Sequence, residues 1–409
     1  MRNPWSVVAV VMLAVASVVA CEPAAANSTY RPVSTARELE LAGYAKVLCS
    51  AVFLSGRDIA EAAKNSGDVL MPAGRDKVTW HVDREQRLVR LTVDGISREA
   101  RFHGDQGCIV QPQEKPGISF TPIRVKTTLP EAMSQPWPMG ESLTATLFAL
   151  LVKDGTYTLE QPAPIPAWGA PGDPRSAIRN IDLLRMSSGL RFIAPRDPDY
   201  TPDKGYPDHL YIYTGGVDVF EYSINQPLQF PVGRTGRYRN SDPLTVGYLI
   251  KQAVTKRGDE YLTWPQRALF DRIGIRRFIL ETDPYGNFLM SGYNYGTARD
   301  WARVGLLHLQ DGVWQGQRVL PEGWAKFVST PAPAWSGRFR YGGFFWLNDG
   351  GAFNLPKDAF YAAGAGGQLA FIVPSKHLVV VRLGHTTGWG AGSRALNDAL
   401  ARLTEAIKS

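Results

Sequence analysis

The stretch Asp182-Leu-Leu-Arg-Met-Ser-Ser-Gly-Leu190 decides the fold of this 409-residue chain. It lies within a long region where helical and loop segments alternate. Its two adjacent serines, Ser187 and Ser188, could be nucleophiles or structural residues. Three further stretches follow it, and their order carries as much information as their content. They are Gly236-Arg-Tyr-Arg-Asn-Ser-Asp-Pro243, Thr297-Ala-Arg-Asp-Trp-Ala-Arg303 and Ala365-Gly-Gly-Gln368.

In this order, the four stretches resemble landmarks of the β-lactamase-related serine hydrolases. That family includes class C β-lactamases, DD-peptidases, esterases and 6-aminohexanoate-dimer hydrolases. The resemblance covers roughly residues 141–409, and the Arg-Tyr-Arg-Asn stretch is most similar to the 6-aminohexanoate-dimer hydrolase and esterase branch. It implies an α+β fold, with a β-lactamase/DD-peptidase-like antiparallel sheet flanked by helices. It also implies that Ser187 and Ser188 are mainly structural.

The chemistry that the resemblance implies is hydrolysis of an amide or ester through an acyl-enzyme. A serine at a helix N-terminus attacks the carbonyl, activated by a tyrosine and by a lysine three residues later on the same helix face. The matching positions imply that Tyr238 is the base and that Asn240 positions the substrate. Gly367 is the implied backbone donor to the oxyanion, and Gly366 allows close approach.

The nucleophile motif itself is missing. Relatives read approximately Trp-Ser-x-x-Lys-Ser, whereas this chain reads Trp137-Pro-Met-Gly-Glu-Ser142. Pro138 therefore occupies the serine position and Glu141 the lysine position. No lysine in the chain has a serine three positions before it. Without these two groups the acylating machinery is absent, and Tyr238 is left as a vestigial base.

Three explanations of the missing motif stay open. In the first, serine and lysine were replaced in place, which the ungapped match of Trp137 and Ser142 favours. In the second, an internal deletion removed the motif, since residues 111–140 hold no convincing hairpin. In the third, Ser142 is a substitute nucleophile, although Ala145 stands where its partner would be needed. The alternative for Ser142 is a helix N-cap.

Three other candidates carry less weight. Ala365 stands where relatives keep lysine or histidine, so their recognition of carboxylates is not implied here. His385-Thr-Thr-Gly388 is similar to that motif but follows the later strand, and we interpret it as a chance match. Asp300 and Arg303, one helical turn apart, predict a structural ion pair.

Before the main domain, residues 35–110 predict a small α+β module. Apolar residues recur at helical spacing over 35–53. The period then changes to two around an Asp-Gly turn at 94–95, which predicts a hairpin over 78–102 that could join the main sheet. Residues 111–140 are rich in proline and polar groups and predict a connector.

The main domain, residues 141–409, opens with an apolar stretch over 142–152 that predicts a helix buried on most sides. Near its end, 369–373 and 378–383 predict two strands joined by a turn. A last helix is predicted from Leu396 and Leu400, which share a face.

The first residues predict an exported protein. An apolar run from Val7 to Ala20 is too short to cross a bilayer, so 1–21 is interpreted as a signal peptide. The run ends in Val-Val-Ala-Cys21, which resembles a bacterial lipobox with Cys21 as the lipidated residue. Signal-peptidase cleavage after residues 24–26 is the alternative. We expect a periplasmic protein, anchored to the membrane if Cys21 is acylated.

Three cysteines in an exported chain leave one unpaired. If Cys21 carries lipid, Cys49 and Cys108 remain as a pair able to form a disulfide outside the cytoplasm. Closing that loop would stabilise the fold by roughly 4 kcal/mol. Two separately buried thiols are the alternative.

Composition and motif spacing bear on partners and cofactors. The net charge is +7, but Lys and Arg are scattered among acids, which argues against nucleic-acid binding. No His-Glu-x-x-His or Cys-x-x-Cys spacing and no Gly-rich phosphate loop occurs, so we expect no metal and no cofactor. The expected partner is a small-molecule amide or ester, or a peptidoglycan-like ligand. Two hypotheses remain: a hydrolase with an unseen nucleophile, and a non-catalytic periplasmic binding lipoprotein.

Overall fold

The N-terminal module folds around one long helix. The computed structural model describes residues 33–407, apart from 69, 72, 114–116, 130–136, 196, 338–339 and 385–390. Helix α1 (Ala36–Cys49) begins at a capping box in which the Thr35 side chain accepts from the Glu38 N–H, and the π-helix η1 (Ser50–Leu54) continues it. A short helix, α2 (Ile59–Asn65), follows. The predicted helix over 35–53 is therefore present.

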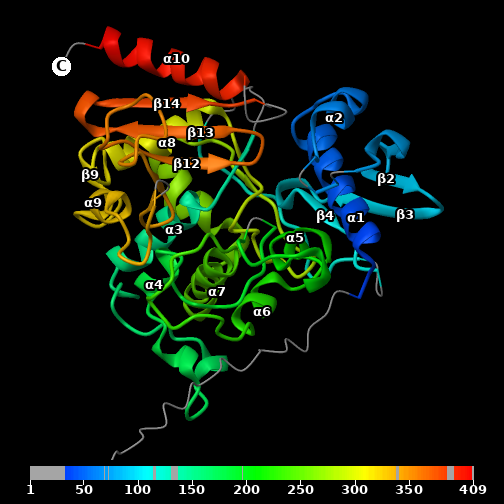
Figure 1. Ribbon diagram of the computed structural model, residues 1–409, viewed down its shortest axis with the longest axis horizontal. Helices are drawn as coiled ribbons and strands as arrows, with labels where there is room; N and C mark the ends of the chain where they lie inside the picture. Colours follow the sequence, from blue (N-terminus) through cyan, green and yellow to red (C-terminus); the bar gives the residue numbers. More distant parts are fainter. Residues whose placement is uncertain are drawn as a thin grey trace, which may run out of the picture.

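Four antiparallel strands complete this module, in the order β1-β2-β3-β4. The turn at Asp94 and Gly95 has positive φ at both residues, as the two-residue hairpin turn requires. One prediction needs correction here. The 78–102 hairpin does not join the main sheet, because among the described strands β1 to β4 form a sheet of their own (Figure 1). The strands are β1 (Thr79–Asp83), β2 (Leu88–Val93), β3 (Ile96–Phe102) and β4 (Cys108–Val110).

The predicted disulfide is present between Cys49 and Cys108. It joins the end of α1 to the start of β4, with 6.0 Å between the Cα atoms. Both cysteines are fully buried among the apolar residues of the module. The bond therefore fixes α1 against the sheet that it covers.

A buried ion pair joins the module to the rest of the chain. Lys46 of α1 lies 2.5 Å from a carboxylate oxygen of Glu281, the residue that follows β6 (Ile279–Leu280). The Ser50 hydroxyl and the Cys108 N–H donate to the other carboxylate oxygen, at 2.7 and 2.8 Å. The Lys46 ammonium also donates to the Cys108 carbonyl. We call these four residues the junction cluster.

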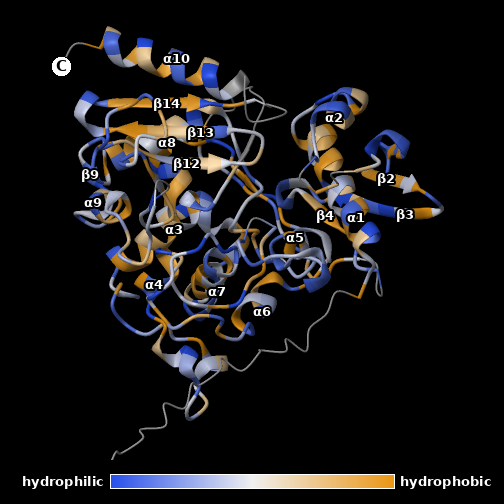
Figure 2. Cartoon of the chain, viewed as in Figure 1, coloured by the Kyte–Doolittle hydropathy of each residue, from blue (hydrophilic) through white to orange (hydrophobic). Residues whose placement is uncertain are grey.

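The main sheet has five antiparallel strands in sequence order, and each face is covered by a helix. In β13, Ala370 and Ile372 pack into the large core on the α8 side, while Leu369 and Phe371 pack with Leu400 of α10. Figure 2 shows the alternating polar and apolar residues of α10. The elements are β10 (Arg340–Tyr341), β11 (Trp346–Leu347), β12 (Phe360–Gly364), β13 (Gln368–Val373), β14 (Leu378–Arg382), α8 (Ala298–Leu309) and α10 (Ala391–Ala406).

A group of helices lies against the other side of the core. The predicted apolar helix is α3 (Ser142–Lys153), which packs against α7 (Ser241–Lys256) and is buried over most of its length. None of the helices in the described ranges is long and apolar enough to span a membrane. The remaining α-helices of the described residues are α4 (Asn180–Leu184), α5 (Asp208–Thr214), α6 (Val219–Ile224) and α9 (Trp324–Ser329). Strands β8 (Val313–Trp314) and β9 (Gln317–Arg318) form a separate hairpin.

The predicted connector at 111–140 ends earlier than expected. Strand β5 (Trp137–Met139) pairs with β7 (Asn294–Gly296), which also pairs with β6, so the main domain already includes residue 137. Earlier in this segment, Ile123 exchanges two hydrogen bonds of 2.9 Å with the Gln106 side chain. These contacts hold Ile123 of the connector against the N-terminal module and residues 137–139 in the sheet of the main domain.

Candidate functional site

A buried carboxyl group lies at the start of α3, where the resemblance places a lysine. Glu141 is the N-cap residue of this helix, and its exposed fraction is 1%. The Tyr238 hydroxyl donates to one carboxylate oxygen at 2.8 Å, and the Tyr341 hydroxyl donates to the other at 2.6 Å. The structure thus brings Tyr238 to the helix that was expected to carry the nucleophile. No motif pointed to Tyr341, which lies in a two-residue strand 200 residues after Glu141.

Ser142 is the first residue of α3, but its hydroxyl serves the backbone of another segment. It donates to the Phe344 carbonyl at 2.6 Å, and the side chain is 2% exposed. The expected N-cap role was wrong, because Glu141 takes the cap position and no side chain caps the helix by a hydrogen bond. The Ser142 proton is therefore committed to a structural contact.

Burial changes the ionisation of this group of side chains. Desolvation raises the pKa of Glu141 to about 7, although hydrogen bonds from Tyr341 and Tyr238 favour its carboxylate. Burial and the nearby Glu141 charge raise the pKa of Tyr238 and of Tyr341 well above the usual value. Both tyrosines are therefore proton donors here, and a role for Tyr238 as a base stays a prediction.

The Glu141 carboxyl should make stability depend on pH. The pKa of Glu141 is about 7 in the folded protein and 4.5 ordinarily. The stability that the neutral carboxyl contributes is therefore fully present below pH 4.5, and it is lost as pH rises through about 7. The loss corresponds to about 3 kcal/mol. Asp242 and Asp283 also have a pKa raised to about 7 by burial, so wild type must be compared with a variant. We expect wild type to lose stability relative to Glu141→Gln between about pH 5 and about pH 8 in urea unfolding. A difference that did not change with pH would contradict this.

Two tryptophans pack against the tyrosines that bond the Glu141 carboxyl. Tyr238 stacks on Trp346 with 5.4 Å between ring centroids, and Tyr341 stacks on Trp335 at 5.0 Å. Trp335 meets Trp346 edge to face at 5.9 Å. Tyr341 is fully buried, whereas Tyr238, Trp335 and Trp346 are only partly buried. These three partly exposed rings are called the aromatic rim below.

Asn240 follows Tyr238 by two residues, and its role as a positioning amide stays a prediction. Its Nδ2 donates to the Tyr213 hydroxyl at 3.1 Å, and that hydroxyl bonds the Ser291 Oγ at 2.7 Å. The Nδ2 also lies 3.4 Å from the His209 carbonyl. Its buried Oδ1 has no hydrogen-bond partner in the described part of the chain. The same holds for the Oδ1 of Asn294, whose Nδ2 donates to the Gly140 carbonyl at 3.2 Å.

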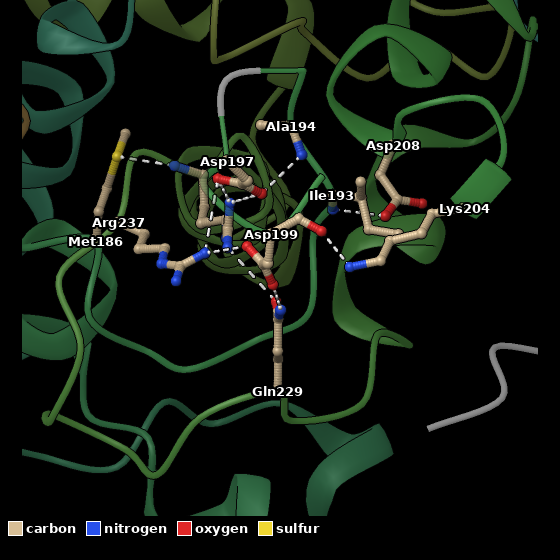
Figure 3. Close-up of polar contacts among 10 residues, drawn as sticks. Met186, Ile193, Ala194, Asp197, Asp199, Lys204, Asp208, Gln229 and Arg237 are labelled. Atoms are coloured by element: carbon tan, nitrogen blue, oxygen red, sulfur yellow. Dashed lines mark hydrogen bonds and ion pairs between the residues drawn. The ribbon is translucent and has the colours of Figure 1, made fainter. Parts of the chain in front are cut away.

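Ion pairs hold the Tyr238 segment in place from both flanks. Arg239 contacts Asp197 at 2.5 Å, and its guanidinium side chain is almost fully buried. Arg237 contacts Asp199 at 2.7 Å (Figure 3). Because both carboxylates come from one loop, this loop fixes the backbone on either side of the Tyr238 ring.

The glycines expected at the oxyanion form a turn instead. Gly366 and Gly367 have positive φ between β12 and β13, and the Gly367 N–H donates to the Gly364 carbonyl at 3.2 Å. The donor that the resemblance implies is thus already engaged. Ala363 of β12 packs closely against Gly140, the residue before the N-cap of α3. A Cβ placed on Gly140 would lie 2.5 Å from the Ala363 carbonyl oxygen.

The remaining candidates have structural contacts. The Ser188 hydroxyl donates to Asp242 at 2.7 Å, and the Ser187 hydroxyl donates to the Asp182 carbonyl at 3.3 Å. Asp300 and Arg303 form the predicted ion pair at 3.9 Å. Cys21 and residues 385–388 lie outside the described residues. Within the described ranges, no three His, Cys, Asp or Glu side chains converge as metal ligands would.

Comparisons with known proteins agree with this architecture. The Beta-lactamase family model matches residues 142–405. A solved structure from Bacillus anthracis, assigned as a 6-aminohexanoate-dimer hydrolase, is 18% identical and superposes with a TM-score of 0.53 over 68% of this chain and 75% of that one. One from Bacteroides dorei DSM 17855, assigned as a beta-lactamase, is 14% identical with a TM-score of 0.50 over 68% and 87%. At these identities the likeness establishes the fold alone. No curated protein matches the sequence.

Proposed function

The chain belongs to the beta-lactamase family of serine hydrolases, and from this premise we propose that it binds an amide, ester or peptidoglycan-like ligand without hydrolysing it. One observation carries the proposal. The position of the activating lysine holds Glu141, and the Tyr238 and Tyr341 hydroxyls both donate to its carboxylate. Both carboxylate oxygens of Glu141 accept from tyrosine hydroxyls, and the residue provides no cation to activate a serine. The site therefore favours ligand binding over acyl transfer.

Acyl transfer needs a nucleophile and a stabilised oxyanion. Pro138 supplies no hydroxyl, and its backbone pairs with Tyr295 in the sheet formed by β5, β7 and β6. A carboxylate at the start of α3 repels the negative charge that develops on the carbonyl oxygen, whereas a lysine would attract it. Both changes oppose the formation of an acyl-enzyme.

The arrangement around Glu141 favours replacement in place over an internal deletion. Glu141 contacts Tyr238, the residue with which the family's lysine acts according to the resemblance. The chain on either side is continuous with described elements, β5 before it and α3 after it. This contact with Tyr238 is what replacement in place would produce.

The second candidate function is an active hydrolase in which Ser142 attacks the substrate. Its hydroxyl donates to the Phe344 carbonyl, and position 145 holds alanine, which cannot act as a base. These observations favour the binding function.

Export and a lipid anchor at Cys21 stay predictions. The Cys49–Cys108 disulfide supports export, because disulfides persist mainly outside the cytoplasm. Membrane fractionation of cells that express the full chain tests them.

The intact mass of folded protein, measured after exposure to a fluorophosphonate and separately to a penicillin, tests the loss of acylation. We expect no adduct with either reagent, because no described serine is paired with a general base at the start of α3. A family member that retains Ser-x-x-Lys serves as the positive control. An adduct that disappears in Ser142→Ala would overturn the proposal and restore the enzyme.

A further inference from the structure

The candidate site is rich in hydrogen-bond acceptors and lacks a cation. The Glu141 carboxylate receives two tyrosine hydroxyls, and no described lysine, arginine or histidine forms an ion pair with it. Two further acceptors, the Oδ1 atoms of Asn240 and Asn294, are buried without a partner among the described residues. A ligand that completes this site must bring donors or positive charge.

We infer that the site binds a cationic nitrogen, such as a substituted ammonium group, on the aromatic rim, which adjoins Glu141 through Tyr238. This inference rests on the proposed binding function and names the ligand's charge. A carboxylate in the lysine position reverses the charge that acyl-transferring relatives present. The same reversal disfavours anionic ligands, because like charges repel in a desolvated site.

The aromatic rim supplies the second part of the recognition. Tyr238, Trp335 and Trp346 are partly exposed residues, whereas Glu141, whose carboxylate accepts from the Tyr238 hydroxyl, is 1% exposed. A cation over the face of a tryptophan or tyrosine is attracted by the ring electrons, and a nearby carboxylate strengthens that attraction. Close packing holds the rim, since a Cβ on Gly236 would come within 2.3 Å of the Trp335 ring.

The carboxylate gives this recognition a pH dependence. The ionisable groups around Glu141 are Tyr238 and Tyr341 in direct contact, with Tyr213 and Asp242 further out and His209 against the Tyr238 ring. An ionised Glu141 adds a charge attraction that the neutral carboxyl does not provide, so affinity for a cation should rise as pH increases through about 7.

Three probes of the same size test the inference: benzylammonium, benzyl alcohol and benzoate. Each is titrated into the full chain at about pH 8, where Glu141 is ionised, with tryptophan fluorescence and saturation-transfer NMR as readouts. We expect benzylammonium to bind about tenfold more tightly than benzyl alcohol, and benzoate to bind most weakly. Glu141→Gln should remove most of the tenfold preference for benzylammonium over benzyl alcohol. Glu160→Gln, which removes one exposed carboxylate elsewhere in the same domain, is the matched control.

The wild-type comparison decides the inference even if Glu141→Gln does not fold. Equal or tighter binding of benzoate, or no binding of any probe, overturns it. A benzylammonium preference that persists in Glu141→Gln places the cation elsewhere and also overturns it. The probe titrations test only the charge of the ligand. The intact-mass measurement tests the binding function itself, which an adduct with the fluorophosphonate would contradict. The two proposals can therefore fail separately.

Discussion

Replacing Glu281 by alanine should lower the free energy of unfolding by about 3–5 kcal/mol, the largest loss that we expect from one substitution. Lys46 is 1% exposed and lies 2.5 Å from Glu281, so the variant leaves an ammonium buried without its counter-ion. Desolvation already lowers the pKa of Lys46, while Glu281 opposes that shift. The Ser50 hydroxyl and the Cys108 N–H lose their acceptor in the same substitution. Urea unfolding measures the loss.

The control for this prediction removes both charges. Lys46→Met combined with Glu281→Leu eliminates the unpaired ion, so the double variant should be less destabilised than the sum of its single variants. Glu99→Ala, which breaks an exposed pair with Arg90, should cost no more than about 1 kcal/mol. If Glu281→Ala were as mild as Glu99→Ala, the junction cluster would not join the two parts energetically.

Removing the disulfide is the second large effect. The double variant Cys49→Ala/Cys108→Ala should be about 4 kcal/mol less stable, because the open chain regains the entropy of a loop between residues 59 apart. Both cysteines are fully buried, so alanine introduces no polar group into the module. Urea unfolding of the variant and of wild type without reductant gives the difference.

Two further measurements sharpen this prediction. Wild type unfolded in the presence of reductant should approach the stability of the double variant. Because the Cys108 backbone also contacts Lys46 and Glu281, the effects of the cysteine variant and of Glu281→Ala should not simply add. A cysteine variant as stable as wild type would show that the loop is already restrained in the unfolded chain.

Local patterns predicted local structure well. The helix over 35–53, the Asp-Gly turn at 94–95 and the apolar helix from residue 142 all follow from periodicity and turn chemistry within short windows. The disulfide followed from a count of three cysteines once one was assigned elsewhere. In each of these cases the decisive residues lie close together or belong to a small set.

Contacts between distant segments could not be predicted in this way. Alternation in 78–102 shows which face of a strand is apolar, but it does not identify the partner sheet, and the hairpin was misplaced for that reason. Tyr341 lies in a two-residue strand without a motif, and Lys46 meets Glu281 across 235 residues. The resemblance pointed to Tyr238 and Asn240, whose roles stay predictions. It did not indicate that the Tyr238 and Tyr341 hydroxyls both donate to Glu141, because Tyr341 lies 200 residues away in the chain.

The junction cluster sets a limit on how this protein can be shortened. A chain that began after residue 110 would keep the whole region that matches the family, yet it would lose Lys46, Ser50 and Cys108 together. Glu281 would then lose its three donors, among them its buried counter-ion. We therefore expect a chain shortened to the region that matches the family to be less stable than the full chain.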